Sequence, residues 1–143
     1  DLRLSDHGNW PHQHWNALVS AYENSPYFEY YADDFRPLYE KPATYLVDFN
    51  EALRQTVCSL LALSCVVTPS DDYVSEPGPG TLDLRGVLTP KRSVTTAPAF
   101  RAVPYYQVFR ERTGFLPDLS IVDLLFNLGP ESRLILRKSL ACH

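Results

Sequence analysis

The densest group of chemically capable side chains lies at the start of the chain. The string Asp6-His7-Gly8-Asn9-Trp10 is followed by His12, His14 and Trp15, so three of the four histidines fall within fourteen residues. Imidazole nitrogens bind metal ions, transfer protons near neutral pH and hydrogen-bond ligands, and indole rings provide flat apolar surfaces. The segment is therefore a candidate binding or catalytic site.

Helical spacing decides which of these groups can act together. The sequence predicts a first helix from about Pro11 to Glu23, with Asn9 as its N-cap. Its apolar face is formed by Trp15, Leu18, Val19 and Tyr22. On this helix His12 lies about 60° to one side of Trp15 and His14 about 100° to the other, so the two cannot easily share a metal. His12 and Asn16, spaced i and i+4, are expected to form a polar pair beside the aromatic face.

Three interpretations of the histidine segment stay open. The imidazoles can cap and hydrogen-bond the start of a helix while the tryptophans pack. They can also form a site without metal, which is the role predicted for His7, Asn9, Trp10 and Trp15. A metal site would need His7 or Asp6 to fold back from the preceding turn, and the sequence has no HxxxH or HExxH motif to support it. No metal and no cofactor are therefore predicted.

Further candidates lie on later elements. Asn50 falls near Leu46 on the apolar face of a third predicted helix, from about Thr44 to Leu61, where a buried amide must find a partner. Asp123 follows Ser120 in an S-x-x-D pattern, and the favoured interpretation is a capping box. A carboxylate at a helix N-terminus can also orient a histidine or bind an amine.

Aromatic hydroxyls and arginines add a second group of possible contacts. Tyr22 and Tyr105 belong to a set of tyrosines with the composition of small-molecule clefts, although packing is the commoner role. Gln107 lies in the same tyrosine-rich segment as Tyr105. The arginines that flank that segment, of which Arg110 is one, can hold a phosphate or carboxylate, although solvated surface charge is commoner.

The elements that must position these residues are mainly helices. A second helix follows Ser25-Pro26 and is expected to end at Pro37, and two more run from Ser120 to Leu128 and from Pro130 to about Leu140. Prolines make 69–103 a long loop or insert, with one or two short strands expected at 65–68 and 81–88. Residues 105–109 have strand-like composition. The prediction is one mainly α domain over 1–143, with packed amphipathic helices.

Composition excludes several classes of protein. With 143 residues and a net charge of −4, the chain lacks the basic face of a nucleic-acid binder. It has no apolar run long enough for a membrane span and no glycine-rich phosphate motif. Three cysteines without CxxC spacing predict neither a disulfide framework nor a zinc knuckle, so a reducing cytoplasmic setting is expected. The absence of methionine leads us to expect a piece of a longer protein, with the missing portion upstream.

Two ordered strings resemble the WbqC-like protein family of bacteria. The first runs from Asp6-His7-Gly8-Asn9-Trp10 through His12-x-His14-Trp15-Asn16-Ala17 to Ser20-Ala21-Tyr22-x-x-Ser25-Pro26-Tyr27-Phe28-x-Tyr30-Tyr31. The second joins Pro104-Tyr-Tyr-Gln107-Val-Phe109 to Gly114-Phe115-x-Pro117-x-Leu-Ser120-Ile-x-Asp123-Leu-Leu-x-Asn127-x-Gly129-Pro130. Members of this family carry an additional portion before the first string, and the segment 69–103 contributes nothing to the resemblance.

The resemblance implies a cytoplasmic transferase of surface-polysaccharide (O-antigen) biosynthesis that attaches an amino acid, such as glycine, to a sugar. In that role His12 or His14 would act as base, and Asp123 would hold a histidine or the substrate amine. The substrate contacts expected are His7, Asn9, Trp10, Trp15, Asn16, Tyr22, Asn50, Tyr105 and Gln107. The partner would be a small molecule or sugar nucleotide. Two alternatives remain: a non-catalytic binding or scaffold module of the same pathway, and a hydrolase with a histidine-bound metal.

Overall fold

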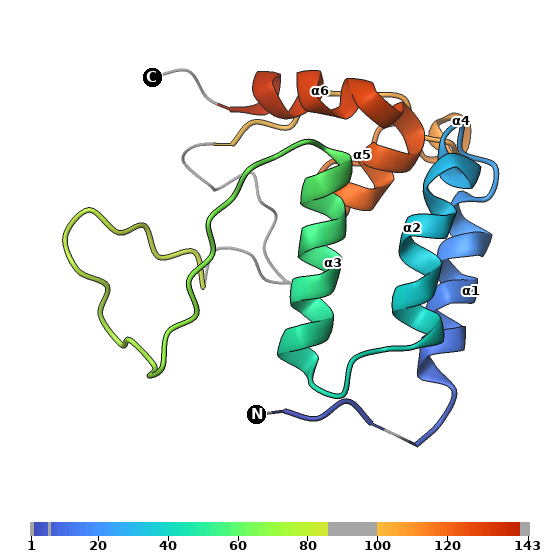
Figure 1. Ribbon diagram of the computed structural model, residues 1–143. Helices are drawn as coiled ribbons and strands as arrows, with labels where there is room; N and C mark the ends of the chain where they lie inside the picture. The colour runs from blue at the N-terminus through green and yellow to red at the C-terminus, as the bar shows by residue number, and fades with distance from the viewer. Residues whose placement is uncertain (1, 6, 86–99, 141–143) are drawn as a thin grey trace.

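The computed structural model describes residues 2–5, 7–85 and 100–140, and this part of the chain is mainly helical, as predicted. The helices are α1 (Trp10–Tyr22), α2 (Phe28–Glu40), α3 (Leu46–Leu60), α4 (Arg110–Thr113), α5 (Ile121–Leu128), the 3₁₀ helix η2 (Gly129–Glu131) and α6 (Ser132–Ser139). Figure 1 shows α2 between α1 and α3, with α5 and α6 across one end of this layer. No helix in the described ranges is long and apolar enough to cross a membrane.

The core forms where α5 meets the end of the three-helix layer. Phe126 is fully buried, and its ring makes edge-on or tilted contacts with Tyr22, Phe28 and Phe35 at centroid distances of 5.3, 5.2 and 5.5 Å. The predicted apolar face of α2 is buried, as expected. Five consecutive residues of α5, Asp123 to Asn127, are also buried, so this helix is enclosed on nearly all sides. The first and last thirds of the chain therefore share one core.

The prediction that Pro37 ends the second helix is wrong, because α2 continues to Glu40. Proline lacks the N–H that would bond to the carbonyl of Asp33, but later residues can still continue the helix, as the bond from Lys41 N to Pro37 O shows. Asp33 and Pro37 are both exposed. The carbonyl without a partner therefore belongs to the water-facing side of α2, where its cost is small.

The expected strands are absent from the described residues. Residues 65–68 and 81–85 are irregular, and 86–88 lie outside the described part. The strand-like segment 105–109 is irregular and turns into α4, and its polar groups bond to α5 and to Leu116 instead of a neighbouring strand. Isolated bridges join Arg3 to Tyr45 and Phe100 to Leu140.

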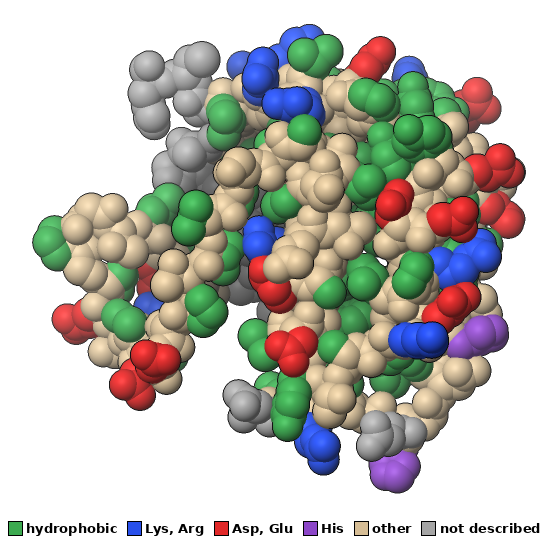
Figure 2. All heavy atoms as spheres, viewed as in Figure 1, with side chains coloured by type: hydrophobic (Ala, Val, Ile, Leu, Met, Phe, Trp, Pro, Cys, Tyr) green, Lys and Arg blue, Asp and Glu red, His purple; other side chains and the backbone are tan. Residues whose placement is uncertain are grey.

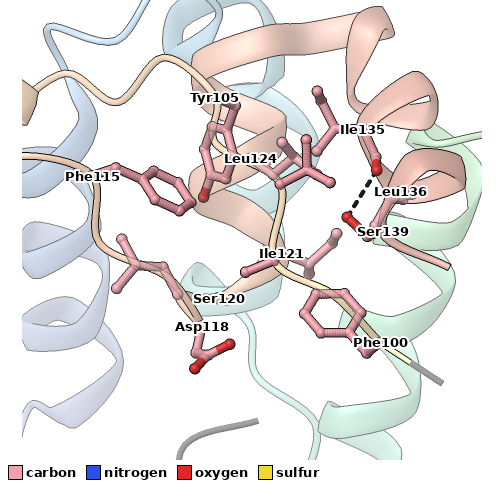
Figure 3. Close-up of a pocket in the computed structure, with 13 residues that line it drawn as sticks. Phe100, Tyr105, Phe115, Asp118, Ser120, Ile121, Leu124, Ile135, Leu136 and Ser139 are labelled. Carbon is pink, nitrogen blue, oxygen red and sulfur yellow. Dashed lines mark hydrogen bonds between the residues drawn. The ribbon is translucent and has the colours of Figure 1, made fainter. Parts of the chain in front are cut away.

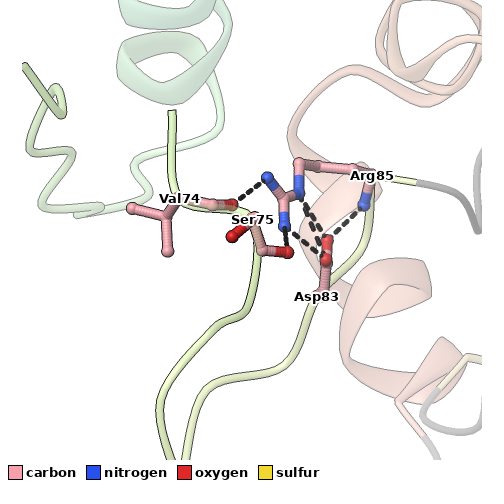
Figure 4. Close-up of polar contacts among 4 residues, drawn as sticks. All are labelled: Val74, Ser75, Asp83 and Arg85. Atoms are coloured by element: carbon pink, nitrogen blue, oxygen red, sulfur yellow. Dashed lines mark hydrogen bonds and ion pairs between the residues drawn. The ribbon is translucent and has the colours of Figure 1, made fainter. Parts of the chain in front are cut away.

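Residues 63–85 form a loop that leaves the helical layer and folds back on itself (Figure 1). Arg85 holds its two arms together (Figure 4): its guanidinium bonds to the carbonyls of Val74 and Ser75 and to the Asp83 carboxylate. The same guanidinium lies over the Tyr73 ring, 5.0 Å from its centroid. One arginine thus replaces regular backbone pairing in this segment.

Candidate functional site

Seven of the twelve predicted site residues fall into two groups at opposite ends of α1, and the other five lie outside both. The first group surrounds a pocket of about 410 Å³ at the N-terminal end of the helix. We call it the Trp10 pocket; its lining residues are Leu4, Ser5, Trp10, His14, Leu46, Phe49 and Asn50. It combines two aromatic rings with an imidazole, an amide and a hydroxyl.

Trp10 is held at this pocket from three sides. Its indole Nε1 donates a hydrogen bond of 3.1 Å to the carbonyl of Ser5. Its ring meets the His14 imidazole edge-on at 5.3 Å and the Phe49 ring edge-on at 5.5 Å. These contacts come from a backbone carbonyl of the N-terminal segment, a side chain of α1 and a side chain of α3, so the pocket exists only when the three elements pack together.

Backbone hydrogen bonds fix the N-terminal segment against α3. Leu4 N donates to Thr44 O at 2.9 Å, and Leu46 N donates to Leu2 O at 2.9 Å. This pairing places Leu4 and Ser5 beside the first two turns of α3, where Asn50 also lies. The N-terminal segment that forms one rim of the pocket is therefore held by hydrogen bonds at the start of α3.

Asn50 is exposed, so the prediction that it is a buried amide is wrong. Leu46, which was expected to mark the apolar face of this helix, is itself 36% exposed. In the first turn of α3 the inward-facing residue is Phe49, which is buried against Trp10 and Tyr39, and later residues such as Val57 pack against the core cluster. Asn50 consequently has a free amide at the Trp10 pocket.

His12 lies outside the pocket and forms the expected pair with Asn16. The Asn16 Nδ2 atom is 3.1 Å from His12 Nδ1, and both residues are exposed. His7 is exposed as well, and its backbone N–H bonds to Ser5 Oγ at 3.1 Å. Within 2–5, 7–85 and 100–140, no group of three or more His, Cys, Asp or Glu side chains is placed to hold a metal ion.

Two residues of the histidine segment, Asn9 and Trp15, belong to the start of α1 and to its packing against α2. Asn9 is the N-cap residue of α1, as predicted, but its side chain makes no capping hydrogen bond. Trp15 packs between α1 and α2, stacked on Phe28 at 6.2 Å and tilted against Tyr39 at 5.9 Å. The Arg36 guanidinium lies over the Trp15 ring, 5.6 Å from its centroid. The ring of Trp15 is thus already packed within the helical layer.

The second group of predicted residues lies at the other end of α1, around the Asp123 carboxylate. Tyr105 donates its hydroxyl hydrogen to Asp123 Oδ2 at 2.6 Å, and Gln107 Nε2 donates to the same oxygen at 3.3 Å. Asp123 and Gln107 are both 4% exposed. The predicted capping box is wrong, because Ser120 makes no side-chain capping bond and only its carbonyl accepts from Asp123 N. The carboxylate holds a tyrosine instead of a histidine.

Tyr22 completes this group, which we call the Asp123 cluster (Tyr22, Tyr105, Gln107, Asp123 and Asn127). Burial first, and then the charge of Asp123, raise the pKa of Tyr22 to about 12. Burial and the hydrogen bond to Asp123 also raise the pKa of Tyr105 well above its ordinary value. Both hydroxyls therefore keep their protons at neutral pH, so they act as hydrogen-bond donors and not as bases.

Asn127 belongs to the cluster but was missing from the sequence prediction. Its Nδ2 donates to Asp123 O at 2.7 Å, and its Oδ1 accepts from Val108 N at 2.9 Å. Gln107 likewise pairs twice with the backbone of Leu116, at 2.8 and 2.9 Å. The signal was present in the sequence, since Asp123 and Asn127 are the i and i+4 polar residues of an otherwise apolar helix.

The two groups do not meet. Tyr22 is the last residue of α1, eight residues after His14, which corresponds to about 12 Å along the helix axis. Asp123 lies at the Tyr22 end, and it lines none of the walls of the Trp10 pocket. Figure 2 agrees, because the histidine side chains visible on that face gather at the end of the molecule away from α5 and α6. A single centre that uses both His14 and Asp123 is therefore not formed.

Comparison with known proteins identifies the relatives of this chain. The sequence model of the WbqC-like protein family matches residues 1–89. The uncharacterized protein Rv1507c of Mycobacterium tuberculosis is 31% identical over 152 residues, covering 90% of this chain. The chain spans 65% of the length of that relative. No solved structure matches the chain. The protein thus belongs to the WbqC-like protein family.

Proposed function

We propose that the chain is a sugar-binding module of surface-polysaccharide biosynthesis in the bacterial cytoplasm. Its ligand would be a sugar or a sugar nucleotide, held in the Trp10 pocket. The pathway comes from the resemblance described above. The observation that carries the binding function is the placement of Trp10, His14 and Asn50 around one pocket of about 410 Å³.

The chemistry of this pocket suits a sugar. The apolar C–H faces of a sugar ring pack well on aromatic side chains, while its hydroxyls need donors and acceptors around the edge. Asn50 supplies both a carbonyl and an NH₂ group, and the imidazole of His14 can donate from one nitrogen and accept at the other. Trp10 is half-buried and fixed by Ser5 and Phe49, so little side-chain entropy is lost on binding.

The separation of the two groups favours binding over complete catalysis. The strongest carboxylate candidate, Asp123, lies beside Tyr22, which is about 12 Å from His14 along the axis of α1. Its Oδ2 already accepts hydrogen bonds from Tyr105 and Gln107. An acid–base pair would need to reach one substrate from both ends of a helix, and a binding module needs only the pocket.

Aminoacyl transfer is the second candidate, favoured by the shared position of His14 and Asn50. An amine on the sugar would attack the carbonyl carbon of an activated acyl donor, and His14 would take the proton of that nitrogen. The Asn50 amide would stabilise the negative oxygen of the tetrahedral intermediate. The donor's leaving group would then depart with the electron pair of the broken bond, which completes the amide.

Calorimetric titration of the 143-residue chain tests the proposal, with N-acetylglucosamine, galactose, a hexosamine and their nucleoside-diphosphate forms as probes. At least one probe should bind, and His14→Ala and Asn50→Ala should each weaken it by about tenfold, or about 1.4 kcal/mol. The exposed pair outside the pocket provides the matched control, so His12→Ala and Asn16→Ala should leave the affinity unchanged. Equal effects of both pairs, or no binding, would refute the proposal.

The same variants separate the two candidates. If the chain is a transferase, His14→Ala abolishes amide formation from an activated glycyl donor, while its affinity for the sugar falls by only the tenfold expected above. If it is a binding module, no acyl transfer is detected with any variant, including the unchanged chain.

A further inference from the structure

A second polar pocket lies at the other end of the molecule, next to α4. It has a volume of about 390 Å³, within the range of small-molecule sites, and we call it the Arg110 pocket. Its lining residues are Pro104, Tyr105, Tyr106, Arg110, Gly114 and Phe115. It shares no residue with the Trp10 pocket, so it is independent of the function proposed above.

The walls of the Arg110 pocket are held in place by the Asp123 cluster. The Tyr105 ring meets the Phe115 ring edge-on at 5.5 Å, and its hydroxyl is fixed by Asp123. The two bonds between Gln107 and the backbone of Leu116 clamp the segment on both sides of α4. Two of the three rings are therefore preorganised, while Tyr106 is 43% exposed and presents its ring to solvent.

Charge distinguishes this pocket from its neighbour. Tyr105 and Phe115 also line an apolar pocket of about 220 Å³ on the side of α6, where the charged lining residue is Asp118 (Figure 3). The Arg110 pocket has the opposite charge. The ion pairs found in the described part of the chain are Glu51–Arg54 and Asp83–Arg85, so the guanidinium of Arg110 is not neutralised by a carboxylate there.

We propose that the Arg110 pocket binds a ligand with a flat aromatic ring and a phosphate or carboxylate group. The ring stacks on Tyr106 and fills the space against Tyr105 and Phe115, where aromatic surface is already fixed. The anionic group pairs with the planar guanidinium of Arg110, which accepts either anion through two parallel hydrogen bonds. Aromatic nucleotides and aromatic carboxylates share this chemistry.

The test measures binding of four probes to the 143-residue chain by calorimetry: uridine monophosphate, 4-hydroxyphenylacetate, uridine and inorganic phosphate. One of the first two should bind at least tenfold more tightly than uridine and phosphate, which carry only half of the recognised chemistry. The tighter of the two identifies the source of the anion as nucleotide or carboxylate.

Variants assign that binding to the pocket. Arg110→Gln and Tyr106→Ala should each reduce the affinity at least tenfold, and Tyr106→Phe should retain it because the ring remains. Arg112→Gln, on the same short helix but outside the lining, is the matched control and should change nothing. Loss of binding in the control, an unchanged Arg110→Gln variant, or equal affinity for all four probes would overturn the proposal. His14→Ala should have no effect, which keeps this result separate from the sugar-binding test.

Discussion

The hydroxyl of Tyr105 donates a hydrogen bond of 2.6 Å to the buried carboxylate of Asp123, eighteen residues later in the chain. This contact and the bond from Val108 N to Asn127 Oδ1 join the segment 104–109 to α5. The two parts of the second family-like string therefore satisfy each other's polar groups. A buried carboxylate that looked like a helix cap or a catalytic group is chiefly a clamp between two segments.

Asp123→Ala should lower the free energy of unfolding by about 2–4 kcal/mol, because Tyr105 and Gln107 lose their shared acceptor inside the core. Asp123→Asn keeps an acceptor oxygen and should cost about half as much. Urea unfolding followed by circular dichroism measures both. The exposed Asp33→Ala on α2 is the control and should stay within about 0.5 kcal/mol. A loss for Asp123→Ala as small as that of the control would contradict the clamp.

Alkaline pH should destabilise the fold through Tyr22. Its pKa is raised from 10.0 to about 12 in the folded chain, so between these values the unfolded state releases a proton that the folded state keeps. The stabilisation is complete below pH 10 and disappears as the pH rises towards 12. Tyr105, whose pKa is also raised, acts in the same direction.

Tyr22→Phe should therefore make stability less dependent on pH in this alkaline range. Urea midpoints measured at a series of pH values, together with the ultraviolet absorbance of tyrosinate, provide the comparison. Tyr30→Phe, at a side chain that is 76% exposed, should reproduce the pH dependence of the unchanged chain. If Tyr22→Phe and Tyr30→Phe give the same curve, the burial of Tyr22 is not the source of the effect.

Gly129→Ala should destabilise the chain by at least about 2 kcal/mol. Gly129 has φ +54°, and an added Cβ would lie 2.5 Å from Cδ1 of Tyr27, a ring atom packed at the junction of α2 and α5. Gly114 is the matched control, with φ +71° and open space around the added atom. Gly114→Ala should cost less than Gly129→Ala, about 1–3 kcal/mol for the backbone strain alone. Equal losses for the two variants would show that the contact with Tyr27 yields without cost.

The helices were predictable because their signals are local. Proline, serine and glycine punctuation and the 3.6-residue spacing of apolar side chains placed α1, α3 and α5 within a few residues of their observed bounds. The pair formed by His12 and Asn16 was predictable for the same reason, since both residues lie on one helix. The family followed from the order of the residues alone.

Contacts between distant segments were decided by the tertiary structure. The partner of Asp123 comes from an irregular segment eighteen residues earlier, and no helical periodicity relates the two. At the start of α3, Phe49 packs on Trp10 of α1 and Tyr39 of α2, while its neighbour Asn50 stays exposed. Local spacing shows which face of a helix a residue occupies, but only packing determines what that face meets. That is why the sequence determined the helices and the family, whereas the tertiary structure decided which candidates line the Trp10 pocket, which form the Asp123 cluster and which lie outside both.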